Sequence, residues 1–104
     1  MSRGPDAATL LERALLAAAQ ASGCPLTVTR SDWTRWSSAT FTGARHLLTL
    51  AGEADPALDD WVAGLPEAEI TLRGHLVADC VVMRVEKKEG RATIALEVLT
   101  LDER

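Results

Sequence analysis

The sequence contains little that would fix a chemistry. Among its 104 residues it has no tyrosine, one phenylalanine, two histidines and two cysteines. A glycine-rich phosphate loop, a GxSxG elbow, HExxH and CxxC motifs and an EF-hand loop are all absent from it. These absences leave open whether the protein is an enzyme, and we assign it no catalytic residue, no metal ligand and no cofactor.

The two cysteines, Cys24 and Cys80, stand far apart and show no metal-ligand spacing. Neither a zinc site nor a disulfide framework is therefore predicted, and we expect reduced thiols. Cys80 lies in the apolar run 77–85 and is expected in the core, whereas Cys24 occupies a helix-to-strand junction.

Positive charge and long apolar runs are also scarce. Eleven Lys and Arg residues face fifteen Asp and Glu residues, and the net charge is −4, which does not favour binding to nucleic acid. The apolar stretch Leu10–Ala21 is interrupted by Glu12 and Arg13, so it predicts neither a signal peptide nor a membrane span. We expect a cytoplasmic protein that binds no nucleic acid and no membrane.

What is present indicates one folded domain spanning residues 1–104. Apolar residues make up 47% of the chain and charged residues 25%, a balance far from that of disordered proteins. A chain of this length has room for one hydrophobic core but not for two.

Two segments have helical periodicity with recognisable ends. The first helix is predicted over residues 6–22, because Gly23 fits the position after a helix end and Pro25 prevents continuation. The second is predicted to begin with Asp55 as N-cap and Pro56 at its first position. Their apolar positions are Leu10, Leu11, Ala14, Leu15 and Ala18 in the first helix and Leu58, Trp61, Val62 and Leu65 in the second.

Strand patterns follow each helix. Residues 26–29 alternate as a short strand does, and Ser31-Asp32 suggests a turn after it. Residues 36–50 form a longer apolar segment whose parity slips in the middle, and a β-bulge near Thr42-Gly43 would restore one apolar face.

The last part of the chain reads as a long hairpin, with strands over 69–85 and 91–101 and a polar turn over 86–90. The order of elements is helix, strand, strand, helix, strand, strand. We therefore predict an α+β fold with a mainly antiparallel four-stranded sheet and two helices on one face. One arrangement with this order is a circular permutation of the ferredoxin-like plait.

Both faces of the last hairpin are apolar. A sheet with one face in water would alternate cleanly between apolar and polar residues. A second copy of the chain is the simplest cover for the extra apolar face, so we predict a homodimer. The alternative is a closed barrel or a loop that covers this face within one chain.

His46 and His75 are candidates for a polar pocket. Asp79 stands four residues beyond His75 with the same strand parity, so the three side chains could meet in one cleft for acid–base work or ligand binding. Arg45 or Arg73 could hold an anion beside them. The alternative is that both imidazoles form hydrogen bonds that only support the fold.

Trp33, Arg35 and Trp36 form a compact cluster of residue types that are enriched in binding hot spots. They could provide a surface for a protein partner or a ligand. The alternative is that the indoles pack over the open end of the sheet.

Two functions remain open on these grounds. The first is a noncatalytic homodimeric module, of the kind found as small bacterial-type domains, that binds another protein or a small molecule. The second is a small-molecule-binding protein or enzyme whose pocket uses His46, His75 and Asp79. The candidate binding residues are Trp33, Arg35, Trp36, His46, Arg73, His75 and Asp79.

Overall fold

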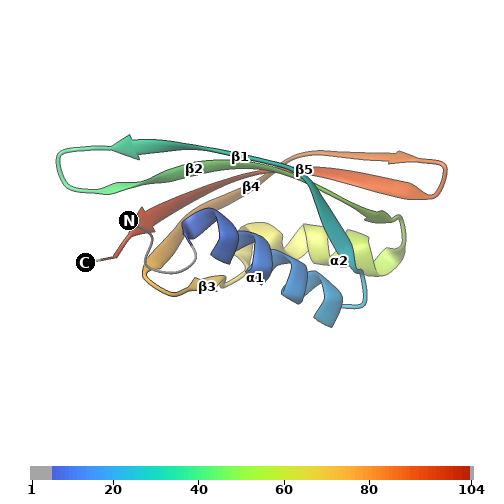
Figure 1. Ribbon diagram of the computed structural model, residues 1–104. Coiled ribbons are helices and arrows are strands. Elements are labelled where there is room, and N and C mark those ends of the chain that lie inside the picture. The colour runs from blue at the N-terminus through green and yellow to red at the C-terminus, as the bar shows by residue number, and fades with distance from the viewer. Residues whose placement is uncertain (1–5, 104) are drawn as a thin grey trace.

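In the computed structural model, which describes residues 6–103, two helices lie against one face of an antiparallel sheet (Figure 1). This arrangement confirms the predicted α+β class. The elements in chain order are α1 (Ala7–Ala21), β1 (Leu26–Ser37), β2 (Thr42–Glu53), α2 (Pro56–Gly64), the 3-10 turn η1 (Leu65–Glu67), β3 (Thr71–Leu72), β4 (His75–Lys88) and β5 (Arg91–Asp102).

Local signals define both helices as the sequence predicts. The Asp6 carboxylate caps α1 by accepting a hydrogen bond from the backbone N–H of Thr9 at 2.9 Å. The Asp55 carboxylate caps α2 in the same way, with the N–H of Leu58 at 2.9 Å. Gly23, at φ +85°, reverses the chain after α1. No helix within residues 6–103 is long and apolar enough to cross a membrane.

The sheet has the strand order β1-β2-β5-β4-β3, so the described residues form five strands instead of the four predicted. The additional strand is β3, which pairs with the first residues of β4. Gly74 makes this turn possible because its φ of +81° is a conformation that other residues rarely adopt. The sequence instead predicts one continuous strand over residues 69–85, and the structure divides this segment into β3 and β4.

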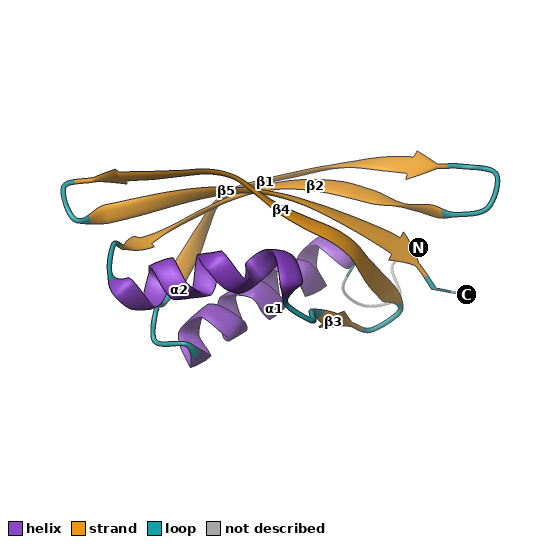
Figure 2. Ribbon diagram, turned by 180° about the vertical axis from the view of Figure 1, so that it is seen from behind, coloured by secondary structure: helices purple, strands orange, loops and turns teal. Residues whose placement is uncertain are grey.

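The β1–β2 and β4–β5 hairpins extend beyond the helices at opposite ends of the molecule, as Figures 1 and 2 both show. At one end, the Lys87 ammonium forms an ion pair with Asp59 of α2 at 2.7 Å. At the other end, the start of α1 lies beneath the β1–β2 hairpin, and the Glu12 carboxylate accepts a hydrogen bond from Ser31 at 2.7 Å.

The core lies between the helices and the central strand β5. Every second residue of β5 faces the helices, and none of these five side chains is more than 1% exposed: Ala92, Ile94, Leu96, Val98 and Thr100. From the helices, Leu11, Leu15 and Leu58 pack against this row and are buried as well. Burial of this apolar surface provides the main stabilisation of the fold.

The first hairpin differs from the sequence prediction in two respects. β1 continues through Ser31 and Asp32, and the chain turns later, where the backbone N–H of Ser38 bonds to the carbonyl of Phe41 at 2.7 Å. The predicted bulge at Thr42-Gly43 is wrong, because pairing runs unbroken there and the extra residue is Thr29. The apolar residues of segment 36–50 change from one strand face to the other because residues 38–41 belong to the turn.

The sheet face away from the helices is open to solvent, as far as residues 6–103 are concerned. Leu47, Leu76 and Val81 lie on it with 47%, 53% and 42% of their surface exposed. Charged residues stand between them, including Arg45 and Glu97, which pair at 3.0 Å. The described part of the chain therefore does not itself cover the second apolar face.

Gly43 provides a test of the strand packing. A Cβ at this position would overlap the backbone carbonyl oxygen of Thr100 in the neighbouring strand. We expect Gly43→Ala to lower the free energy of unfolding by about 1–3 kcal/mol, because the strands must move apart. Urea unfolding measures this change.

The matched control is Gly64→Ala. Gly64 has a helical backbone, at φ −87° and ψ −9°, and nothing lies within 4 Å of an added Cβ. Alanine there should stabilise the protein by about 0.4–1 kcal/mol. Equal effects of the two substitutions would contradict the close approach of β2 and β5.

Candidate functional site

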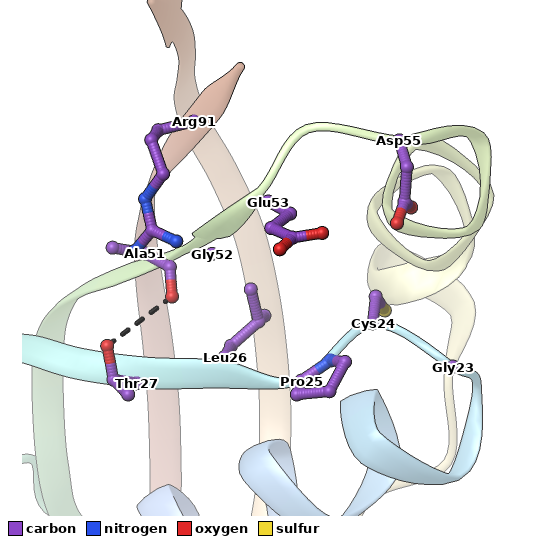
Figure 3. A pocket seen from close by; sticks show the side chains of 10 residues that line it. All are labelled: Gly23, Cys24, Pro25, Leu26, Thr27, Ala51, Gly52, Glu53, Asp55 and Arg91. Carbon is purple, nitrogen blue, oxygen red and sulfur yellow. Dashed lines mark hydrogen bonds between the residues drawn. The ribbon is translucent and has the colours of Figure 1, made fainter. Parts of the chain in front are cut away.

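Residues 6–103 line two hollows of interest between the helices and the sheet. The first, of about 320 Å³, opens where α1 leads into β1 and β2 leads into α2 (Figure 3). In it the Glu53 and Asp55 carboxylates face the space beside Cys24, and Arg91 lies on the other side of the strand (Figure 3).

The polar groups of this first hollow already serve the fold. Asp55 caps α2, and the Cys24 thiol donates to the carbonyl of Ala19 at 3.4 Å. Burial, and then the charge of Asp55, raise the pKa of Cys24, so the reactive thiolate form is disfavoured. We therefore assign the first hollow a structural role.

The second hollow, of about 160 Å³, lies between the start of α1 and the helix-facing side of the β1–β2 hairpin. Five segments that are distant in sequence meet there. Its chemically informative lining residues are Asp6, Ala7, Ala8, Trp33, Arg35, His46, His75 and Asp102. We call this hollow the His46 pocket.

His46 itself is 1% exposed. Its Nε2 lies 2.9 Å from the hydroxyl oxygen of Thr100, and that hydroxyl donates to the carbonyl of Ala44 at 3.4 Å. A threonine hydroxyl has one proton, so when that proton goes to Ala44 the imidazole proton lies on Nε2; the roles of the two ring nitrogens depend on this tautomer. Within residues 6–103, Nδ1 has no hydrogen-bond partner.

The protonation of His46 follows from its surroundings. Burial, and then the nearby His75, lower the pKa of His46, while Asp6 and Glu12 of α1 act in the opposite direction. The neutral form is favoured as a result. A neutral imidazole that carries its proton on Nε2 presents Nδ1 as a hydrogen-bond acceptor.

His75 and Arg35 converge on Asp102 at the last position of β5. The distances are 3.2 Å from His75 Nδ1 to one carboxylate oxygen and 3.3 Å from the Arg35 guanidinium to the other. The Thr42 hydroxyl donates to this second oxygen at 3.3 Å. These contacts fix both basic side chains at the border of the His46 pocket.

The start of α1 adds backbone donors. The N–H groups of the first helical residues have no acceptor within the helix, and Asp6 satisfies that of Thr9. Ala7 and Ala8 precede Thr9 and line the pocket. The N-terminal end of a helix also carries a partial positive charge, which the Asp6 carboxylate at this border offsets in part.

The structure brings together Trp33, Arg35, His46 and His75 from the predicted set. It places Trp36 on the opposite side of β1, where it pairs with Gly43, and its indole N–H is buried without a partner among the described residues. Trp33 and Trp36 therefore do not form one surface.

Asp79 and Arg73 lie outside the pocket. Arg73 is exposed in the turn before β4. Asp79 shares its parity with His75 in the sequence, but the extra residue Ala78 forms a bulge and turns Asp79 to the open face. Arg45, the alternative anion contact, also lies on that face with Glu97.

Sequence reasoning missed Asp102 and the first turn of α1. Their contribution depends on tertiary pairing, which no local motif indicates. Within residues 6–103, no three His, Cys, Asp or Glu side chains gather as a metal site would require. Comparisons with protein families, curated proteins and solved structures found no match.

The burial of His46 predicts how stability depends on pH. Its pKa is lowered in the folded protein, so its contribution is fully present above the unfolded value of about 6.5 and is lost as the pH falls below it. Between pH 7.5 and 5.5, wild-type protein should lose up to about 1.4 kcal/mol more stability than His46→Gln. Urea unfolding at both pH values measures the difference.

The control is His75→Gln, which removes the other histidine of the pocket and leaves His46 in place. Burial, the main cause of the lowered pKa of His46, remains in this variant, so the variant should retain most of the wild-type loss of stability between the two pH values. If His46→Gln loses as much stability on acidification as wild-type protein does, His46 is not held neutral by the fold.

Proposed function

We propose that the protein is a noncatalytic binding protein whose His46 pocket holds a small anion that carries a hydroxyl group. Hydrogen phosphate and small hydroxy acids belong to this class. The observation that carries the proposal is the buried His46 ring, which lines the pocket and whose Nδ1 has no hydrogen-bond partner among residues 6–103.

The anionic part of the ligand would meet positive groups on two sides. The Arg35 guanidinium uses one nitrogen for Asp102 and has further N–H donors available in its planar fork. Ala7 and Ala8, in the first turn of α1, line the same hollow from the opposite element, and N–H groups at this end of a helix can bind an anion. Two carboxylates, Asp6 and Asp102, also line the pocket, but each is already engaged within the protein, by Thr9 and by Arg35 with His75. The remaining donors therefore support an anionic ligand.

The hydroxyl group of the proposed ligand is inferred from the position of the proton on the His46 ring. A neutral Nδ1 repels a fully deprotonated oxygen but accepts a hydrogen bond from an O–H group. A bare dianion would require His46 to take up a proton, against the effect of burial on its pKa.

The pocket size supports a small ligand. Its volume of about 160 Å³ equals roughly five water molecules in the liquid. Drug-sized ligands occupy pockets of about 300–1,000 Å³. A phosphate, or an acid with a short carbon chain, has the appropriate size.

The alternative function of the two histidines is acid–base catalysis. The acid–base hypothesis needed Asp79 as a third group, but this side chain lies across the sheet. The remaining groups are arranged to hold a charge and an O–H. We therefore propose binding without chemical conversion.

Two further proposals concern the cellular compartment of the protein and the topology of its fold. A reducing compartment such as the cytoplasm suits the buried free thiols of Cys24 and Cys80. The four long strands have the spatial order β1-β2-β5-β4, which supports a permuted ferredoxin-like plait with β3 added at its edge.

The proposed function predicts saturable binding of inorganic phosphate at neutral pH. Amide resonances of Ala7 and Ala8 should shift in NMR spectra during a phosphate titration. Arg35→Gln should weaken binding at least about tenfold, because a charge-assisted hydrogen bond contributes about 1.5–3 kcal/mol.

Arg45→Gln is the matched control. Arg45 and Arg35 are 63% and 66% exposed and each pairs with a carboxylate that is 32% exposed, but Arg45 lies on the other face. Its variant should bind phosphate as wild-type protein does. Sulfate, which carries no proton at neutral pH, should bind at least about tenfold more weakly than phosphate. Equal binding of the two anions, or equal effects of the two arginine variants, would contradict the proposal.

A further inference from the structure

We propose that two copies of the chain pack through the sheet face that the helices leave open, with reciprocal ion pairs between Asp79 of one copy and Arg84 of the other. This inference concerns a surface separate from the His46 pocket and is independent of ligand binding.

The open face has the size and composition of an interface. Four strands about 4.8 Å apart, with about ten residues each at about 3.4 Å, make a face of roughly 650 Å² before side chains are counted. A standard interface buries about 800 Å² on each partner. Leu47, Leu76 and Val81 provide exposed apolar side chains on this face.

The edges of the sheet are less suitable for a second copy than its face. The outer strand β1 contains an extra residue at Thr29, and β4 contains extra residues at Ala78 and Met83. Bulges interrupt the regular row of N–H and C=O groups that edge-to-edge pairing needs. Packing face to face, as in a β-sandwich, avoids this obstacle.

The charges on the face are self-complementary. Glu97 pairs with Leu47 on one side and Val81 on the other, so the three form a row across the sheet. Asp79 lies in the next row on one side, opposite Leu99, and Arg84 in the next row on the other side, opposite Ala95.

A twofold axis above the central row, parallel to the sheet and perpendicular to the strands, would exchange the two flanking rows. Asp79 of each copy would then face Arg84 of the other copy, so the dimer would contain two such ion pairs. A symmetric dimer requires such a self-complementary patch.

The pairing within each chain is compatible with this arrangement. Asp79 has no ion-pair partner among residues 6–103, and Arg84 reaches Glu86 only at 3.9 Å. Both side chains therefore remain available. Glu97, which would approach its own copy at the axis, is already neutralised by Arg45 at 3.0 Å. Leu47 and Val81 would meet their counterparts at the centre.

Sedimentation equilibrium of the full chain over a concentration series tests the proposal. Wild-type protein should be a dimer that dissociates on dilution. Asp79→Arg and Arg84→Asp should each weaken dimerisation at least about tenfold, because each places like charges opposite one another. The double variant restores both pairs with reversed sign and should dimerise within about threefold of wild-type protein.

Asp60→Arg is the control, since this exposed residue lies on α2 at the other side of the molecule. It should leave dimerisation unchanged, and urea unfolding should show all variants folded. A monomeric wild-type protein overturns the proposal. So does a double variant that associates no better than the single ones, or a loss of dimer in Asp60→Arg.

Discussion

The pairing of β5 between β2 and β4 is the constraint on which the structure depends. One parity of β5 is buried beneath the helices, and the register with its two neighbours then assigns every side chain of β2 and β4 to one face. His46 and His75 come to the helix side by this pairing, whereas Arg45 and Asp79 come to the open side. The candidate pocket and the proposed dimer surface are thus two consequences of one register.

The helix α1 links the stability of the fold to the chemistry of the pocket. Its apolar side packs against β5 through Leu11 and Leu15, and this packing carries the first turn to His46. The contact buries the imidazole, which keeps it neutral, and brings the first residues of α1, whose N–H groups have no acceptor within the helix, to the same hollow. An acceptor and several donors therefore occupy one small space, a combination suited to an anion that also carries a proton.

Features that depend on interactions between residues close in sequence could be predicted. Features that depend on pairing between distant strands could not. The helix ends could be predicted because Asp6, Asp55 and Gly23 act on backbone groups within a few residues. The bulges could not, because an extra residue such as Ala78 is defined only against a partner strand. The shared parity of His75 and Asp79 in the sequence therefore gave a wrong prediction of where Asp79 lies. Asp102 reaches the site only because β5 pairs with β4, which brings it to His75, 27 residues earlier in the chain.

The nitrogen resonances of the His46 ring test the proposed site most directly. Long-range proton–nitrogen NMR spectra distinguish a protonated ring nitrogen from an unprotonated one. In the free protein, the hydrogen bond to Thr100 predicts a proton on Nε2 and none on Nδ1. Phosphate should shift the Nδ1 resonance and leave Nε2 almost unchanged. A proton on Nδ1 in the free protein, or a His46 ring that does not respond to saturating phosphate, would contradict the site.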